Sequence, residues 1–97
     1  MKWPPENLNE LLKRSAEILS AAGATAVYVF GSAAKGRMHE DSDVDLAVSG
    51  LSPVDYIPAK VKVGNLFGRS VDLIDLDLES PFTRYLKTKA GMLRRVV

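Results

Sequence analysis

The chain has 97 residues, and its 13 basic and 12 acidic side chains give a formal net charge of +1. A nearly neutral chain has no overall attraction to polyanions, so we expect neither direct nucleic-acid binding nor a membrane partner. The absence of cysteine excludes disulfides, thiolate nucleophiles and zinc sites built on Cys. A hydrophobic share of 46% is typical of a globular protein, and we expect one domain over residues 1–97. No segment resembles a signal peptide or a membrane helix, so a cytoplasmic protein is expected.

The first third of the chain predicts a helix and then a buried strand. Apolar residues recur at spacings of three and four over residues 5–22, with Gly23 suited to the position just after the helix. A β-branched and aromatic run follows at residues 26–30 and predicts a strand. Gly31 and Ser32 end this run, and a short helical turn is expected to begin at Ser32, before a polar loop.

The rest of the chain predicts further strands alternating with helices. Residues 43–48 alternate as a strand, with Asp43, Asp45 and Ala47 on one face. Residues 52–55 resemble a helix start with a capping box, but Pro58 predicts a broken turn there and a helix over 59–67. A strand over 71–76, a helix over 80–90 and an edge strand over 92–97 complete the chain. This order predicts an α/β (α+β) fold with a small mixed sheet of three to five strands covered by helices.

The residues that carry chemistry form one pattern along the chain. Gly31-Ser32 is followed after ten residues by Asp43-Val44-Asp45, and Asp72 lies on the next predicted strand. Carboxylates at positions i and i+2 of a strand point to the same face, about 6.5 Å apart along the backbone, and a neighbouring strand lies about 4.8 Å away. Three acidic groups so close together repel one another unless a cation neutralises them. Hard oxygen ligands favour Mg²⁺, and two such ions can stabilise an in-line phosphoryl displacement.

Gly31 and Ser32 predict a phosphate site beside these carboxylates. A glycine at a strand-to-helix turn allows close approach of the backbone, and the N–H groups that follow can point at an anion. Lys35 and Arg37 follow within a turn and could neutralise phosphate oxygens. Cations beside a triphosphate cradle suit the transfer of a nucleotidyl group from a nucleoside triphosphate.

The Gly31-Ser32 pair with Asp43 and Asp45 resembles the G-S-x10-D-x-D signature of the polymerase-β-like nucleotidyltransferases. The short chain and the Val71-Asp72-Leu73 strand resemble the minimal nucleotidyltransferase (MNT) branch. The resemblance covers nearly the whole chain and implies the nucleotidyltransferase fold. It implies that Asp43 and Asp45 hold two Mg²⁺ ions. Asp72 would complete one metal site and help to activate the acceptor hydroxyl, and Gly31 and Ser32 would hold the β- and γ-phosphates of ATP.

Two positions depart from the family pattern. Lys35 stands where the family more often has Arg, and a Lys offers a point charge in place of a bidentate fork. Pro58 interrupts the helix expected between the second and third strands, which affects that helix and not the site.

The resemblance also implies a partner. Members of this branch are similar to antitoxins that pair with a small helical HEPN-domain toxin and transfer AMP from ATP to one of its tyrosines. On this interpretation the chain is a protein adenylyltransferase. Two alternatives stay open: an antitoxin that neutralises its partner by complex formation alone, and a small-molecule nucleotidyltransferase. The oligomeric state, including a homo-oligomer, is also open.

Structural interpretations compete with some of these roles. Ser32 could be a helix N-cap, which is compatible with phosphate binding. Lys35 and Arg37 are as easily surface charges as phosphate ligands. His39 has no second His or Cys near it, so we expect no zinc site there. The basic C-terminal stretch is interpreted as a solvated face, with a contact to an acidic partner as the alternative; it comprises Arg84, Lys87, Lys89, Arg94 and Arg95.

Overall fold

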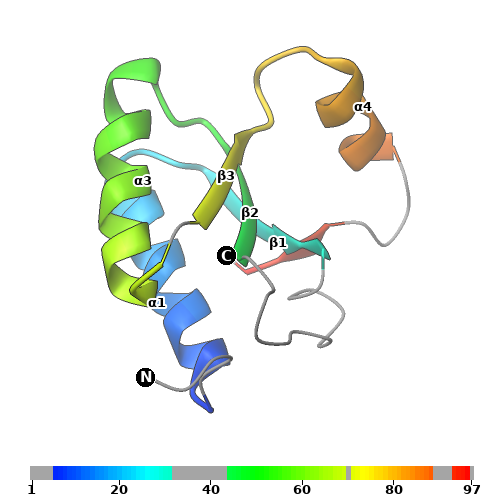
Figure 1. Cartoon of the computed structure of the whole chain (residues 1–97). Coiled ribbons are helices and arrows are strands. Elements are labelled where there is room, and N and C mark those ends of the chain that lie inside the picture. The colour runs from blue at the N-terminus through cyan, green and yellow to red at the C-terminus, as the bar shows by residue number, and fades with distance from the viewer. Residues whose placement is uncertain (1–5, 32–43, 70, 89–92, 97) are drawn as a thin grey trace.

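The computed structural model describes residues 6–31, 44–69, 71–88 and 93–96. Within these ranges the chain forms three helices and four strands, which Figure 1 shows with the helices to either side of the sheet. In chain order they are α1 (Leu8–Ala21), β1 (Ala26–Phe30), β2 (Val44–Ser49), α3 (Pro53–Phe67), β3 (Val71–Asp75), α4 (Pro81–Thr88) and β4 (Arg94–Arg95).

The strands form one mixed sheet in the order β3-β2-β1-β4. β1 pairs antiparallel with β2 and with β4, whereas β2 and β3 are parallel. A parallel pair needs a crossover between its strands, and α3 supplies it. The expected mixed sheet is confirmed, and Arg94 and Arg95 lie on the predicted edge strand.

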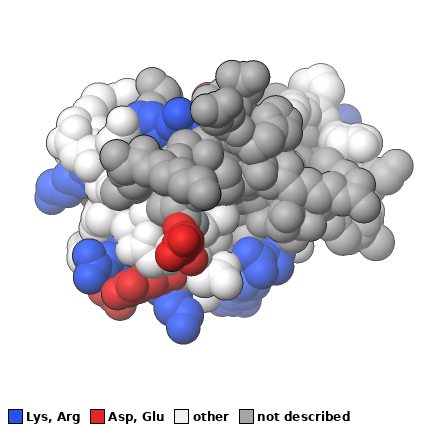
Figure 2. Space-filling view, turned by 60° about the horizontal axis from the view of Figure 1, so that its bottom comes forward, with Lys and Arg blue, Asp and Glu red and all other residues white. Residues whose placement is uncertain are grey.

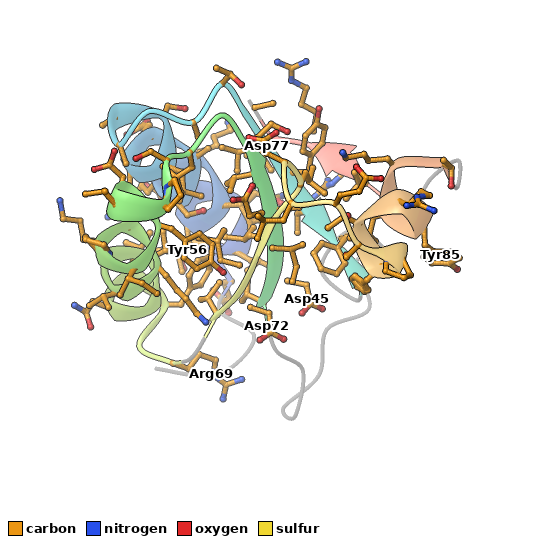
Figure 3. All side chains as sticks on the ribbon, turned by 90° about the horizontal axis from the view of Figure 1, so that it is seen from above. Asp45, Tyr56, Arg69, Asp72, Asp77 and Tyr85 are labelled. Atoms are coloured by element: carbon orange, nitrogen blue, oxygen red, sulfur yellow. The ribbon has the colours of Figure 1, made fainter. Side chains whose placement is uncertain are left out.

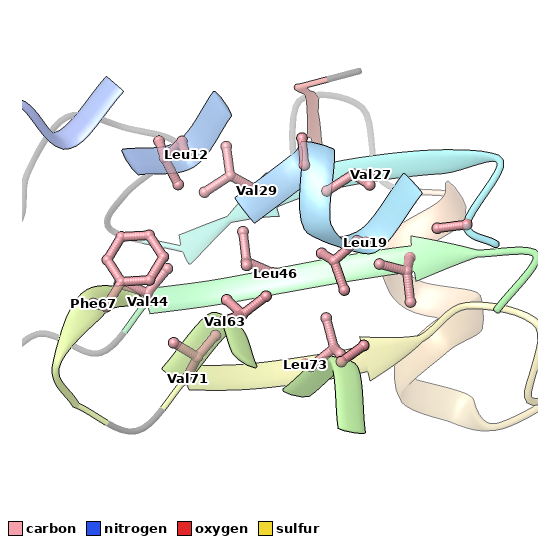
Figure 4. Close-up of a cluster of buried hydrophobic side chains, with 14 of the residues drawn as sticks. Leu12, Leu19, Val27, Val29, Val44, Leu46, Val63, Phe67, Val71 and Leu73 are labelled. Atoms are coloured by element: carbon pink, nitrogen blue, oxygen red, sulfur yellow. The ribbon is translucent and has the colours of Figure 1, made fainter. Parts of the chain in front are cut away.

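One face of the sheet carries the main hydrophobic core, which α1 and α3 cover (Figure 4). Val44, Leu46 and Val48 of β2 are fully buried in it, as the alternation along this strand predicts. Leu19 of α1 and Val63 of α3 are fully buried in the same cluster. Burial of this apolar surface is the main source of stability of the fold.

The other face carries a smaller cluster together with α4. Phe30, Ala47, Leu76 and Leu86 are buried there. The ring of Phe30 also lies 6.2 Å from that of Phe82, at an interplanar angle of 60°. Ala47 and Leu46 therefore lie on opposite faces of the sheet. The face of Ala47 is the one on which the sequence predicts Asp45.

Most helix and strand bounds follow the sequence within one or two residues, but α1 begins at Leu8 and not at the predicted residue 5, and β4 is shorter than the predicted 92–97. β1 covers the predicted residues, and Gly23 lies after the end of α1 with a φ of +118°. The predicted break at residues 52–58 is wrong, because α3 is continuous through Pro58. Proline removes one hydrogen bond to the carbonyl four residues earlier, that of Val54, which lies at an exposed position where water can replace it. Ala59 and Val63 bury the helix against the sheet, and this packing outweighs the cost of the proline.

The predicted capping box at the start of α3 is also wrong. Ser52 is the N-cap residue, but its hydroxyl makes no capping bond to the backbone. It donates instead to Oδ2 of Asp55, at 2.7 Å. The first turn of α3 therefore lacks one of the side-chain bonds that usually satisfy a helix N-terminus.

Candidate active site

Asp45 and Asp72 face each other across two neighbouring strands. The parallel register of β2 and β3 pairs Asp45 with Asp72 directly. Figure 3 shows their side chains next to each other at the same side of the molecule. Asp45 is half-buried and Asp72 is exposed, so a ligand can reach both carboxylates.

Gly31 lies against Asp45 at the end of β1. The antiparallel register pairs Phe30 with Asp45, which brings the next residue, Gly31, close to the same carboxylate. Its φ of +69° is a left-handed conformation that glycine adopts without strain. A Cβ at this position would lie 2.5 Å from Oδ2 of Asp45. The absence of a side chain at position 31 therefore allows the carboxylate of Asp45 to lie directly against the backbone there.

Four of the predicted site residues lie outside the described residues: Ser32, Lys35, Arg37 and Asp43. Gly31 precedes the segment that holds these residues, and Val44 follows it. Gly31 lies beside Asp45 in space, and Val44 precedes Asp45 in the sequence. The described residues bring together Gly31, Asp45 and Asp72. Within the described ranges no group of three or more metal-binding side chains is present.

The donor set fits Mg²⁺. Asp45 and Asp72 offer carboxylate oxygens from adjacent strands, and Mg²⁺ is bound in proteins by one or two carboxylates with water and phosphate. Glycine at position 31 lets the carboxylate of Asp45 keep its position against the end of β1.

Tyr56 of α3 contacts β3, the strand that carries Asp72. Its hydroxyl donates a hydrogen bond to the backbone carbonyl of Leu73 on β3. Burial raises the pKa of Tyr56 above its ordinary value of 10.0, and the negative charges of Asp75 and Asp72 raise this pKa further. Tyr56 therefore stays protonated and ties α3 to the strand that carries Asp72.

Two hollows flank β3. A hollow of about 570 Å³ lies against Asp72 and is lined by Lys60, Asn65 and Arg69 among others. A larger hollow of about 820 Å³, mostly apolar, lies between α3 and α4 and is lined by Tyr56 and Phe82 among others. Asp45 and Asp72 do not line the larger hollow, whereas Asp72 lines the smaller one.

Charges on the surface are mixed. On the face shown in Figure 2, basic and acidic side chains lie close to one another. This agrees with the formal net charge of +1. Attraction of an anionic substrate must therefore come from groups close to the site.

Lys60, Arg69 and Tyr56 were not predicted as site residues. Arg69 lies three residues before Asp72 and two residues after the predicted helix end at residue 67, and this proximity is a signal available in the sequence. Lys60 and Tyr56 lie on α3, and their closeness to Asp72 depends on how α3 packs along β3, which no local pattern shows.

Comparisons with known proteins identify the family of this chain. The family model described as "Polymerase beta, Nucleotidyltransferase" matches residues 6–93 of the chain. The chain belongs to the polymerase beta nucleotidyltransferase family. It is therefore an enzyme, a nucleotidyltransferase, as the sequence motif predicts.

Relatives of this nucleotidyltransferase include a protein of Methanocaldococcus jannaschii that carries the provisional name of a protein adenylyltransferase. It is 28% identical over 81 residues, which are 80% of this chain and 87% of the relative. A solved structure described as a minimal nucleotidyltransferase is 28% identical, with a TM-score of 0.77 and 92% of both chains covered.

A more distant structural match of the nucleotidyltransferase comes from a complex of a tri-AMPylated HEPN toxin of Shewanella oneidensis with an MNT antitoxin. It is 20% identical, with a TM-score of 0.65, and the alignment covers 92% of this chain and 71% of that one. At this level of identity the match shows the fold alone. The three helices and the four-stranded mixed sheet are those of the nucleotidyltransferase fold.

None of the helices in the described ranges is long and apolar enough to span a bilayer.

Proposed function

We propose that this nucleotidyltransferase transfers AMP from ATP to a hydroxyl, a tyrosine in particular, of a HEPN-type toxin partner and so acts as its antitoxin. The observation that carries the proposal is the pairing of Asp45 with Asp72 beside Gly31, at one end of the sheet. The HEPN partner and the AMP group are taken from the complex of AMPylated HEPN toxin and MNT antitoxin, to which this chain is similar. We further propose that residues 1–97 act as a single catalytic domain.

Each predicted site residue has a role in this proposal. Asp43, Asp45 and Asp72 would hold Mg²⁺, which when bound neutralises charge on the phosphate oxygens of the substrate. Gly31 and Ser32 would hold the β- and γ-phosphates through backbone N–H groups and the serine hydroxyl. We propose Lys35 and Arg37 as additional phosphate contacts.

The reaction would be a single displacement. The acceptor oxygen attacks the α-phosphorus of ATP, a new P–O bond forms, and the bond to the β-phosphate oxygen breaks to release pyrophosphate. Asp72 would accept the proton of the acceptor hydroxyl, and its exposed side chain on the outer strand of the pair supports this role. Asp45 lies between Asp72 and Gly31 and would hold the metal ion together with Asp72.

Intact-mass measurement of a HEPN-type partner tests the proposal. We expect the partner to gain one or more AMP units after incubation with this chain, ATP and Mg²⁺, and to gain none without Mg²⁺. Asp45→Asn should lower the rate by a factor of about 100 or more, because the charge stabilisation it supports is worth several kcal/mol. Glu17→Gln, at an exposed position of α1, is the matched control and should keep the wild-type rate.

Two results would contradict the proposal. Wild-type transfer by Asp45→Asn would exclude the assigned role of Asp45. A stable complex with the partner but no added AMP would favour an antitoxin that acts by binding alone.

A further inference from the structure

A basic hollow lies beside Asp72 at the open edge of the sheet. β3 is the outermost strand on this side, so its outer edge pairs with no other described strand. The C-terminal half of α3 and the start of β3 enclose a hollow of about 570 Å³ there. Its lining includes Lys60, Asn65, Gly68, Arg69 and Asp72.

The hollow lies on the side of Asp72 that faces away from Asp45 and Gly31 (Figure 3). In Figure 3, Arg69, Asp72 and Asp45 follow one another along the same side of the molecule. Gly31 adjoins Asp45 from β1, which is on the other side of β2 from β3. If the triphosphate occupies the Gly31 side, as proposed above, the hollow lies on the side from which an acceptor reaches Asp72.

The charge of the hollow differs from that of the chain as a whole. Residues 56–69 contain Lys60, Lys62 and Arg69 and no Asp or Glu, although the formal net charge of the chain is only +1. Lys60 is exposed and Arg69 is half-buried, so both can meet a ligand that enters the hollow. An Arg and a Lys that line the same hollow suit carboxylates, which the guanidinium can bind in a bidentate manner.

We infer that this hollow binds the acceptor segment and selects a hydroxyl that is flanked by acidic residues. Lys60 and Arg69 would hold the flanking carboxylates, and the hydroxyl would then lie at Asp72. The identity of the reacting hydroxyl rests on the proposed function, whereas the preference for an acidic segment rests on the hollow itself. Asn65, which also lines it, offers an amide for a backbone or side-chain contact.

Binding of labelled peptides tests the charge preference without any chemistry. Three fluorescein-labelled peptides with one central tyrosine would be compared by anisotropy, with Glu, Gln or Lys on both sides of the tyrosine. We expect the Glu peptide to bind between about threefold and tenfold more tightly than the Gln peptide, with the Lys peptide weakest. The preference should fall as the ionic strength rises, because the charges are near the surface.

Variants of the two cations identify the site of this preference. The double variant Lys60→Gln with Arg69→Gln should bind the three peptides equally, and Arg69→Lys should retain part of the preference. Lys13→Gln, an exposed lysine on α1, is the matched control and should behave as wild type. The KM for ATP in the transfer reaction should be the same in the double variant as in the wild type.

The outcomes separate this inference from the proposed function. Equal binding of all three peptides by the wild type would overturn the inference, even if AMP transfer occurs. A raised KM for ATP in the double variant, with the peptide preference unchanged, would also overturn it and assign the hollow to the nucleotide. Preferential binding of the Glu peptide that depends on Lys60 and Arg69 supports it, and if no AMP is transferred the proposed function alone fails.

Discussion

Gly31 combines two constraints that are usually separate. Its φ of +69° favours glycine on conformational grounds, and the carboxylate of Asp45 occupies the space that a side chain would need. Gly23 also has a positive φ, of +118°, but a Cβ there would meet no atom within 4 Å. The two glycines therefore share the backbone constraint, and only Gly31 adds the contact with Asp45.

Gly31→Ala should consequently affect both stability and activity, whereas Gly23→Ala should affect stability alone. The positive φ costs an alanine roughly 1–2 kcal/mol in the left-handed region. At position 31 the added methyl group also displaces Oδ2 of Asp45, so we expect a rate of transfer at least about tenfold lower, because misplaced catalytic groups cost strongly. Urea unfolding and initial rates of AMP transfer measure the two effects. Equal rates of transfer by both variants would contradict the importance of the close contact between Gly31 and the carboxylate of Asp45.

Tyr56 links stability to pH. Its pKa in the folded state is raised by burial and by the charges of Asp75 and Asp72, so the folded chain holds the phenolic proton more tightly than the unfolded chain does. The contribution of Tyr56 is therefore fully present below a pH of about 10, the unfolded pKa, and is lost as the pH rises toward the folded pKa.

Tyr56→Phe should lower the free energy of unfolding at pH 7 by about 0.5–1.5 kcal/mol, because the hydrogen bond to the carbonyl of Leu73 is lost. It should also make the decline of stability above pH 10 shallower than in the wild type. Urea midpoints between pH 7 and pH 11 for both proteins measure this. A steeper decline in the variant would show that Tyr56 is not the group responsible.

The starts of α3 and α4 look alike in sequence but differ in structure. Each has a serine followed by a proline, Ser52-Pro53 and Ser80-Pro81. The hydroxyl of Ser80 accepts the backbone N–H of Thr83 at 3.1 Å, and Oγ1 of Thr83 accepts the backbone N–H of Ser80 at 3.0 Å. This reciprocal pair is a capping box, with threonine in place of the usual Glu or Gln. Ser52 instead bonds to the side chain of Asp55.

Ser80→Ala should therefore destabilise the chain more than Ser52→Ala does. Loss of an N-cap bond costs about 1 kcal/mol, and the buried Thr83 also loses a partner. The exposed contact between Ser52 and Asp55 is worth a few tenths of a kcal/mol at most, as is common for pairs on helix surfaces. Urea unfolding of the two variants measures the difference, and equal losses would contradict the assignment of the cap.

The part of the molecule that the structure describes is packed unevenly across the sheet. The cluster under α1 and α3 holds most of the buried apolar residues, whereas the cluster with α4 has Phe30, Ala47, Leu76 and Leu86. Regions with few buried apolar contacts open locally at a lower free energy than the rest of a protein. Among the described residues, the face of the sheet that carries Asp45 therefore has fewer buried apolar side chains than the opposite face.

Amide hydrogen exchange should show this difference. We expect the amides of α4 to exchange through local opening, at a lower free energy than those of α1 and with little dependence on low concentrations of urea. The amides of α1 should instead require unfolding of the whole core, so their exchange should accelerate with urea. Equal protection of α1 and α4 would show that both clusters unfold as one unit.

Much of the fold follows from local patterns of residues. The spacing of Leu11, Leu12 and Leu19 predicts α1, and the alternation of Val44, Leu46 and Val48 predicts the buried face of β2. These patterns are reliable because side-chain direction repeats with the backbone period of a helix or a strand. The motif that joins Gly31 with Asp45 likewise predicts the family, which the family comparison confirms.

Other features depend on contacts between segments that are distant in the chain. Pro58 predicts a break when considered alone, but packing of Ala59 and Val63 on the sheet keeps α3 continuous. The register that places Asp72 opposite Asp45 requires the pairing of β2 with β3, since either carboxylate could have faced another neighbour. The closeness of Lys60 to Asp72 similarly exists only once α3 lies along β3. Local preferences amount to a few tenths of a kcal/mol per residue, whereas burying a side chain is worth about 1.5–3 kcal/mol, so packing decides wherever the two disagree.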